Sequence, residues 1–358
     1  MRIALISTPF VAVPPRLYGG TELVVHELAE GLVARGHEVV LFATGESRTT
    51  AGLRWLYAHA QWPPEMLADL NHVSWAMQQV AQHGAFDLIH AHSAVALACA
   101  RLVPEIPMVY TLHHEREEQL SAFYRHCQNA HYIAISEDQR RREIAMRDVT
   151  VIHHGLDPAK YQYSAHPAGD YVCFVGRFSR VKGPHTAIDA AARAGVPIRL
   201  AGEVHPPDEA WAAAELQPRL DQPHVCYLGG IGLREKAPLL CGARALLAPI
   251  EWNEPFGLIL IEAMLSGCPV VAYERGSVPE LVEDGLTGFI AHSFEHLVEL
   301  IRPGGAVDSF DRRRCRARAI ERFSRDRMVA EHLALYDRAC RRIPALALGN
   351  ERASLMFA

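Results

Sequence analysis

The sequence has little that marks disulfide-stapled, membrane-spanning or nucleic-acid-binding proteins. Its eight cysteines are scattered and form no C-x2-C pair, so neither a disulfide framework nor a zinc ribbon is expected. No apolar run approaches the roughly 18 residues of a transmembrane helix, and the apolar stretch near Met1 is too short for a signal peptide. The 36 basic and 41 acidic side chains leave a net charge of −5, which gives no overall attraction to nucleic acid. We therefore expect a cytoplasmic protein.

Motifs that point to other enzyme classes are also missing. The first strand is not followed by a G-x-G-x-x-G fingerprint, which argues against a nicotinamide-dependent dehydrogenase. No D-x-D motif stands where a metal ion would hold a diphosphate. Internal repeats of roughly 20–50 residues are absent as well.

What the chain does contain is an alternation of short apolar runs with amphipathic helical segments, which is typical of parallel α/β proteins. Its 358 residues favour two domains. A stretch rich in proline, glycine and polar residues at 156–169 interrupts the alternation and forms the natural hinge. We predict an α/β fold with two doubly wound, Rossmann-like sheets, in domains at 1–160 and 161–325, followed by a helix at 326–343 and a tail at 344–358. The predicted strands are Arg2–Ser7, Glu38–Thr44, Asp87–His92, Met108–His113, Tyr132–Glu137, Thr150–His154, Tyr171–Arg177, Ile198–Glu203, Val225–Gly229, Ala245–Ile250 and Pro269–Tyr273.

The most informative segment is 251–264, Glu-Trp-Asn-Glu-Pro-Phe-Gly-Leu-Ile-Leu-Ile-Glu-Ala-Met. A short strand runs into a Pro-Phe-Gly turn, where a helix is predicted to begin. Pro255 suits the first helical position because it has no N–H to lose, which leaves the amides of Phe256, Gly257 and Leu258 free. With the helix dipole behind them, these amides suit a phosphate, and Gly257 lets the backbone approach closely.

Two acidic residues flank this predicted helix start. Glu262 lies roughly 8 Å along the helix axis from the amides, about the distance from a diphosphate to a ribose. Glu254 stands on the other side of the phosphates, where a transferred sugar would lie. The layout predicts a sugar-nucleotide site. The alternative is a surface loop followed by a core helix with two solvated glutamates.

A second loop supplies positive charge. Arg177 ends the first strand of the second half, and Lys182 begins the helix that follows. Both side chains can converge on a diphosphate, whose negative charge grows as the glycosidic bond breaks, and fixed cations stabilise such charge. They would also take the place of a divalent metal. The alternative is a solvated pair that flanks a turn; Arg180, between the two, is expected to be spare.

The first half offers weaker signals. Gly19 and Gly20 permit a tight turn with exposed amides before a helix at Thr21–Arg35, which Thr21 can cap; a plain turn is equally consistent. Three strands end in histidine pairs, namely His90 and His92, His113 and His114, and His153 and His154. A metal could use two histidines on one strand face, but the spacing indicates no third ligand. We predict that His113 is a polar group lining a cleft.

Two later features leave alternatives open. Glu280 is either a helix-start acid or a ligand of the sugar. The crowded arginines of 312–327 form either a solvated basic face or a contact with anionic lipid or an acidic acceptor.

Together, these motifs resemble family 4 of the retaining glycosyltransferases, which have the GT-B fold. The resemblance runs from Met1 to about Arg342 and rests on Gly19-Gly20-Thr21-Glu22, Thr111-Leu-His113, Gly176-Arg177 with Lys182-Gly183, and Glu254-Pro-Phe-Gly-Leu with Glu262-Ala-Met. It implies two Rossmann-like domains that face each other across a cleft, with the nucleotide held mainly by the C-terminal domain. It also implies that the C-terminal helix crosses back to the N-terminal domain.

The resemblance implies a role for each residue of the donor side. Arg177 and Lys182 would neutralise the donor diphosphate, and the amides of residues 256–258 would bind it. Glu262 would bind the ribose hydroxyls, and Glu254 the hydroxyls of the transferred hexosyl-type sugar. Gly19 and Gly20 would lie near the phosphates and the acceptor, and His113 would approach the sugar from the N-terminal domain.

The implied reaction retains anomeric configuration and needs no metal or cofactor besides the nucleoside-diphosphate sugar. The acceptor stays open among a lipid-linked sugar, a glycan, a small metabolite and a protein. The chain departs from the family pattern at His154-Gly155-Leu-Asp157 and at Ala201-Gly202-Glu203, which leaves the domain-junction contacts and the choice of UDP, GDP or ADP undecided. The alternative functions are a non-catalytic sugar-nucleotide-binding protein and a glycoside phosphorylase.

Overall fold

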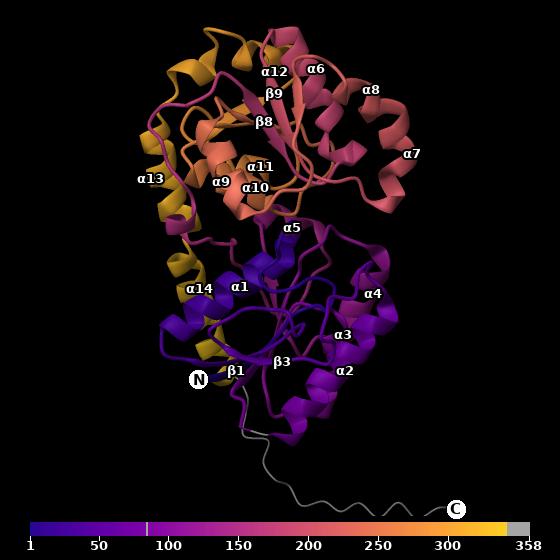
Figure 1. Cartoon of the computed structure of the whole chain (residues 1–358). Coiled ribbons are helices and arrows are strands. Elements are labelled where there is room, and N and C mark those ends of the chain that lie inside the picture. Colours follow the sequence, from indigo (N-terminus) through magenta and orange to yellow (C-terminus); the bar gives the residue numbers. More distant parts are fainter. Residues whose placement is uncertain (84, 342–358) are drawn as a thin grey trace, which may run out of the picture.

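The computed structural model describes residues 1–83 and 85–341, and its two parallel sheets stand one above the other in Figure 1. The first sheet has the strand order β3-β2-β1-β4-β5-β6-β7 and the second the order β10-β9-β8-β11-β12-β13. Two doubly wound α/β sheets are therefore confirmed. The strands are β1 (Arg2–Ile6), β2 (Glu38–Phe42), β3 (Gly52–Arg54), β4 (Leu88–Ala91), β5 (Met108–Thr111), β6 (His131–Ala134), β7 (Val149–Val151), β8 (Val172–Val175), β9 (Ile198–Ala201), β10 (Val225–Tyr227), β11 (Leu246–Ala248), β12 (Val270–Tyr273) and β13 (Gly288–Ala291).

Helices connect the strands and cover the faces of the sheets (Figure 1). Those of the first half are α1 (Gly20–Ala34), α2 (Met66–Gln82), α3 (Val95–Cys99), α4 (Glu118–His126) and α5 (Glu137–Arg142). Those of the second half are α6 (Pro184–Ala194), α7 (Glu209–Trp211), α8 (Gln217–Leu220), α9 (Leu233–Gly242), α10 (Leu258–Leu265), α11 (Val278–Leu281), α12 (Phe294–Ile301), α13 (Arg312–Phe323) and α14 (Arg325–Arg341).

In both sheets the chain order reverses beside the first strand. β1 lies between β2 and β4, and β8 lies between β9 and β11. Loops that leave the carboxyl ends of such strands run in opposite directions and open a crevice, which is where open α/β sheets bind ligands. The loops after β1 and β8 are therefore the first places to look for a site.

Apolar clusters cover both faces of each sheet, which explains why the strands read as continuous apolar runs. In β1, Ile3 and Leu5 belong to one buried cluster, and Ala4 and Ile6 belong to another on the opposite face. The sequence pattern missed β3 and β13. Each is a short strand at a sheet edge, and β3 has no buried residue, so neither carries a strong apolar signal.

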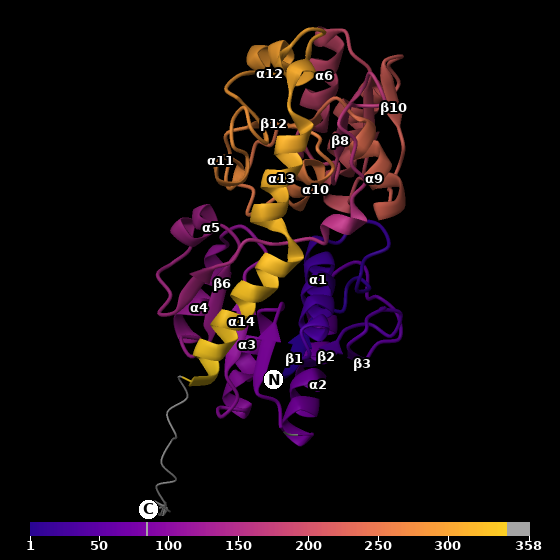
Figure 2. The ribbon, with the colours of Figure 1, turned by 90° about the vertical axis from the view of Figure 1, so that its left-hand side faces the viewer.

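The C-terminal helices join the two halves. Figure 2 shows α13 beside the upper sheet and α14 beside the lower one, nearly end to end. Met328, Leu335 and Tyr336 of α14 are buried in the same cluster as Ile3 and Leu5, so the predicted crossing helix is confirmed. The domain limits at 160 and 325 stay predictions, and the predicted tail at 344–358 lies outside the described residues.

Most arginines of 312–327 act as intramolecular donors, which makes the solvated-face interpretation wrong for them. Four bind backbone carbonyls, namely Arg312 (Ser164, Cys241 and Ala243), Arg316 (Pro158 and Tyr161), Arg322 (Glu280 and Leu281) and Arg327 (His153 and His154). Four pair with acids, namely Arg318 and Arg322 (both with Glu283), Arg325 (Glu27 and Asp157) and Arg327 (Glu331). These contacts tie α13 and α14 to both halves, and lipid contact stays an untested prediction. None of the helices within residues 1–83 and 85–341 combines the length and apolar character needed to cross a bilayer.

Candidate functional site

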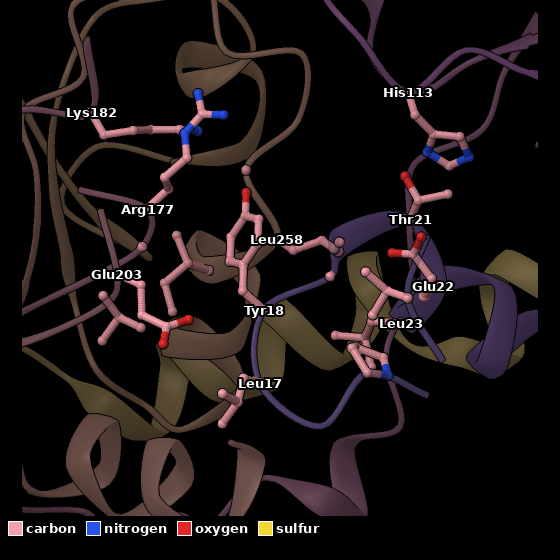
Figure 3. A pocket seen from close by; sticks show the side chains of 18 of the residues that line it. Leu17, Tyr18, Thr21, Glu22, Leu23, His113, Arg177, Lys182, Glu203 and Leu258 are labelled. Carbon is pink, nitrogen blue, oxygen red and sulfur yellow. The ribbon is translucent and has the colours of Figure 1, made fainter. Parts of the chain in front are cut away.

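A cavity of about 910 Å³ lies between the two sheets and is lined by loops that follow β1, β5, β8, β9 and β11. Figure 3 shows Arg177 and Lys182 on one side of it and His113, Thr21 and Glu22 on the other. The structure brings all the predicted site residues to this cavity: Gly19, Gly20, His113, Arg177, Lys182, Glu254, Phe256, Gly257, Leu258 and Glu262. Their roles stay predictions, but their convergence is a property of the fold.

The helix after β11 begins later than the sequence predicts. α10 starts at Leu258, and Gly257 precedes it with a left-handed φ of 86°, so Pro255 lies in the loop and is not the first helical residue. Gly257 is therefore the last residue of the loop, and the helix begins directly after it. Within the described residues, the amides of Phe256, Gly257 and Leu258 donate no hydrogen bond. They are therefore available to an anion, as predicted, although the helix itself supplies only the last of them.

Lys182 and Glu254 are direct partners. The sequence predicts Lys182 at the donor diphosphate and Glu254 beside the transferred sugar; in the structure the Lys182 ammonium forms an ion pair with the Glu254 carboxylate. Trp252 holds both: its Nε1 donates to Glu254 at 2.9 Å, and its ring lies 4.7 Å from the Lys182 Nζ. Lys182 ends a short 3-10 turn, and Gly183 follows at a φ of 75°, where a Cβ would meet the Pro249 carbonyl oxygen at 2.3 Å. The tight turn thus places Lys182 beside the loop that contains Glu254.

Glu262 is 2% exposed and is held in place by two donors. The Lys236 Nζ lies 2.6 Å from its carboxylate, and the Tyr161 hydroxyl donates to it at 3.0 Å. Burial and the neighbouring Glu262 carboxylate raise the pKa of Tyr161 well above its ordinary value, so the hydroxyl keeps its proton. Lys236 lines the same cavity. Glu262 therefore faces the cavity as an oriented carboxylate.

Arg177 leaves β8 directly after Gly176 and reaches into the cavity. Within the described residues its buried Nε has no hydrogen-bond partner. A guanidinium in this position has N–H groups that can donate hydrogen bonds to a ligand oxygen. Arg180, on the neighbouring turn, is exposed and does not line the cavity.

The Gly19–Gly20 turn faces the donor-side helix. α1 begins at Gly20 with Gly19 as its cap residue, and no side chain caps it, so the predicted capping role of Thr21 is wrong. A Cβ on Gly19 would meet that of Pro15 at 2.7 Å, and one on Gly20 would meet the Leu258 side chain at 3.5 Å. Gly19 is thus required by the loop that leads into α1, and the neighbouring Leu258 shows that the starts of α1 and α10 lie close together.

His113 lies at the first-sheet wall of the cavity, as predicted. Its Nε2 is 2.7 Å from Nδ1 of His92, and its ring stacks on His154 with centroids 5.5 Å apart. Burial, with the neighbouring His114 and His332, lowers the pKa of His113 to about 3. Within the described residues, no group of three or more His, Cys, Asp or Glu side chains is arranged to hold a metal ion.

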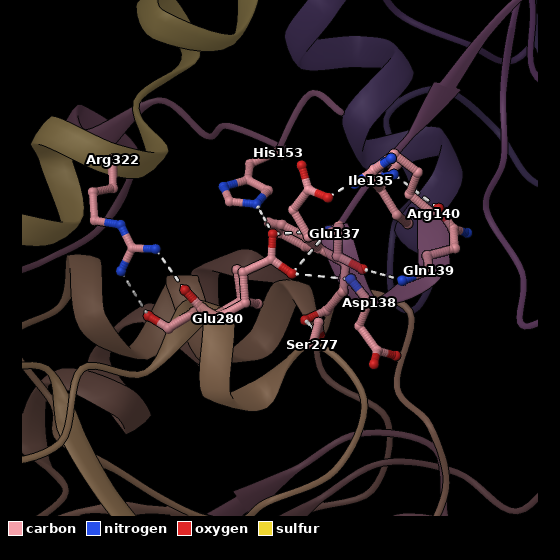
Figure 4. Close-up of polar contacts among 12 residues, drawn as sticks. Ile135, Glu137, Asp138, Gln139, Arg140, His153, Ser277, Glu280 and Arg322 are labelled. Atoms are coloured by element: carbon pink, nitrogen blue, oxygen red, sulfur yellow. Dashed lines mark hydrogen bonds and ion pairs between the residues drawn. The ribbon is translucent and has the colours of Figure 1, made fainter. Parts of the chain in front are cut away.

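Glu280 is a helix-start acid and does not line the cavity. Its carboxylate crosses to the first half, where it accepts the backbone amides of Glu137 at 2.9 Å and Asp138 at 3.3 Å and pairs with His153 at 2.5 Å (Figure 4). Burial alone would raise the pKa of Glu280, but the bonds from His153 and the amides outweigh it and lower the pKa. Glu280 therefore joins the two halves of the molecule.

Sequence reasoning missed several cavity residues. Lys236 could have been found from its place on the helix that follows the glycines at 229–232, and Trp252 from its place beside Glu254. Glu22 belongs to the motif Gly19-Gly20-Thr21-Glu22, but the sequence predicts no role for it. It lines the cavity, and burial raises its pKa. Tyr161, which lies in the predicted hinge, does not line the cavity but donates to Glu262, and no local pattern indicates this contact.

Comparisons with known proteins agree with this geometry. The family model "Glycosyltransferase Family 4" matches residues 18–160, and "Glycosyl transferases group 1" matches residues 162–303. An alpha-maltose-1-phosphate synthase of Mycolicibacterium smegmatis is 28% identical over an alignment that covers 94% of this chain and 99% of that protein. A glycogen synthase of Mycobacterium tuberculosis is 27% identical, with 80% and 81% covered. The crystal structure of Anabaena Alr3699/HepE in complex with UDP-glucose superimposes with a TM-score of 0.70 at 24% identity, covering 94% of this chain and 100% of that one.

The two family models match consecutive parts of the chain, and the two sheets have the arrangement of the solved relative. The chain is a glycosyltransferase of family 4 with the GT-B fold.

Proposed function

We propose that this enzyme is a retaining, metal-independent glycosyltransferase that moves a hexosyl group from a nucleoside-diphosphate sugar to an acceptor hydroxyl. The observation that carries the proposal is the convergence of Arg177, Lys182 and the start of α10 on one cavity. Two cations match the charge of about −2 on a diphosphate, and the amides before α10 add hydrogen bonds. Fixed cations also supply the charge that a divalent metal supplies elsewhere, which is the reason for proposing metal independence.

Donor binding exchanges the partner of Lys182. The ammonium turns from the Glu254 carboxylate to the diphosphate, whose charge is larger. The released carboxylate of Glu254 then accepts hydrogen bonds from hydroxyls of the transferred sugar. The contact between Lys182 and Glu254 thus supports both predicted roles, because one side chain frees the other.

Transfer breaks the bond between the anomeric carbon and the diphosphate oxygen. The acceptor oxygen bonds to the same face of that carbon, and its proton passes to the departing phosphate oxygen. Negative charge grows on the diphosphate during this step, so Arg177 and Lys182 stabilise the transition state more than the bound donor. Front-face attack retains the anomeric configuration without a protein nucleophile.

The donor's ribose binds at Glu262. Its carboxylate accepts hydrogen bonds from two vicinal hydroxyls, and Lys236 and Tyr161 hold it in the orientation required. UDP-glucose is the first donor to test, because the HepE structure contains it. The acceptor is a hydroxyl compound from the class of lipid-linked sugars, glycans and small metabolites.

A donor-hydrolysis assay tests the proposal. The purified chain is incubated in EDTA with radiolabelled UDP-, ADP- and GDP-sugars, and slow release of free sugar is followed without acceptor. Release from one donor, with the anomeric configuration retained in NMR spectra recorded before mutarotation, is the expected result. Binding without turnover would indicate a sugar-nucleotide-binding protein, turnover only with inorganic phosphate would indicate a phosphorylase, and loss of turnover in EDTA would refute metal independence.

A further inference from the structure

His113 forms a hydrogen bond with a buried histidine, His92, and the proposed reaction gives His92 no role. β4 and β5 are neighbouring parallel strands, so the residues that follow their carboxyl ends meet at one edge of the sheet. This adjacency places Nδ1 of His92 2.7 Å from Nε2 of His113. His92 is only 5% exposed, so its ring is shielded from water, whereas His113 lines the cavity.

Neighbouring rings fix the orientation of both histidines. The His90 ring packs 4.4 Å from that of His92, and the His154 ring stacks on that of His113. His90 engages both of its own nitrogens, with the Tyr336 hydroxyl at 2.6 Å and the Thr111 hydroxyl at 2.8 Å. It has no nitrogen to offer to His92, so the bond to His113 is the one polar contact of the His92 ring that the described structure contains.

The position of the proton in this bond follows from the remaining nitrogens. Burial lowers the pKa of His92 well below its ordinary value and that of His113 to about 3, so both rings are neutral at pH 7. A neutral imidazole has one N–H and one bare nitrogen. Nε2 of His92 is buried and has no partner within the described residues.

Two proton arrangements can form the bond, and they differ in cost. If His113 donates, the single N–H of His92 lies on Nε2, buried without an acceptor. If His92 donates from Nδ1, the unpaired Nε2 is only a bare lone pair. Buried N–H groups without an acceptor are rarer in proteins than under-satisfied acceptors, which favours His92 as the donor and Nε2 of His113 as the acceptor.

The proton of His113 must then lie on its other nitrogen. Within the described residues Nδ1 of His113 makes no hydrogen bond and is not among the buried unpaired atoms, and the ring lines the cavity. We propose that His92 is a positioning residue that holds His113 in the Nδ1–H tautomer, so that His113 donates a hydrogen bond to an oxygen of the bound sugar or acceptor. The ligand named here rests on the proposed function; the tautomer does not.

Nitrogen NMR on the protein labelled with ¹⁵N-histidine tests the tautomer without any substrate. His92→Asn and His92→Leu form a matched pair, because the two side chains have the same shape and only asparagine retains an N–H at the δ position. Wild type and His92→Asn should show His113 protonated at Nδ1, and His92→Leu should lose that preference. A wild-type His113 that is protonated at Nε2, or a His92→Leu variant with an unchanged tautomer, would overturn the inference.

Kinetics with the donor identified by the hydrolysis assay give the functional readout. kcat of His92→Leu should be at least about tenfold below that of His92→Asn, with equal melting temperatures to show that both variants fold. Equal kcat values for the two variants would show that the tautomer does not matter to transfer. A wild-type chain that hydrolyses no donor would refute the proposed function and leave the NMR result standing.

Discussion

Replacing Lys182 with alanine tests the central electrostatic argument. The ammonium is directed at the diphosphate, whose charge grows toward the transition state, so its loss should affect the chemical step more than donor binding. Removing one fixed hydrogen-bond donor from such a charge costs about 3–4 kcal/mol. We therefore expect kcat of Lys182→Ala to fall about 10²- to 10³-fold, with a smaller change in KM.

The same substitution has a structural cost that must be measured separately. Glu254 is 7% exposed and loses its ion-pair partner, and the side chain of Lys182 is itself only 17% exposed. Breaking such a pair should lower the free energy of unfolding by about 2–3 kcal/mol. Denaturant titration gives this quantity, and steady-state kinetics well below the melting temperature gives the catalytic one.

Two controls separate the alternatives. Arg180→Ala removes an exposed cation two residues away and should leave kcat and KM unchanged. In a double-mutant cycle with Glu254→Gln, the effects of the two substitutions should not add, because the side chains touch. If Lys182→Ala raised KM and left kcat intact, Lys182 would contribute only uniform binding, and the proposed role would be wrong.

Three further predictions concern the donor, the contact between the halves and the backbone. Glu262→Gln should weaken donor binding about 10- to 100-fold in calorimetry, because a neutral amide accepts ribose hydroxyls less strongly; an unchanged Kd would contradict the ribose role. Glu280→Gln should lower the free energy of unfolding by about 1–3 kcal/mol at pH 7, whereas exposed Glu274→Gln should not. Because the pKa of Glu280 is lowered in the fold, its contribution is complete above the ordinary carboxyl range and is lost as the pH falls below about 4, so a pH-independent difference from wild type would count against the lowered pKa. Gly276→Ala places a Cβ 2.3 Å from a backbone nitrogen at a φ of 54°, whereas Gly285→Ala, at a φ of 73°, meets nothing within 4 Å. Gly285→Ala should cost about 1 kcal/mol from strain alone, and Gly276→Ala more, together with weaker donor binding; equal losses in denaturant titrations would contradict the clash.

Local sequence pattern predicted the fold class and the residues of the cavity well. Arg177 and Gly257 each sit where a strand ends or a helix begins, and parallel strands bring such positions to one edge of a sheet. The pattern was less accurate about where α10 starts, because Gly257 adopts its left-handed conformation in a loop whose path depends on packing. It also missed β3 and β13, whose short edge segments bury too little apolar surface to leave a signal.

Contacts between distant segments were beyond the reach of sequence reasoning. The arginines of 312–327 looked like a solvated face, since nothing in the sequence indicates which carbonyls and carboxylates they meet. Glu280 left two readings open, and its bridge to His153 joins residues from different halves. The pairing of Lys182 with Glu254 likewise depends on two loops that lie side by side only in the folded chain.

By itself, the sequence determined that two doubly wound sheets form and which loops line the space between them. Strand and helix preferences depend on residues near one another along the chain, and parallel order then sends every strand end to the same edge. Only the tertiary structure decided which side chains became partners: Lys182 with Glu254, Lys236 with Glu262, and His92 with His113. Hydrogen bonds and ion pairs form only where the distance between donor and acceptor is right to within a few tenths of an ångström, and such distances are set when the loops and helices of each half pack together in the folded chain.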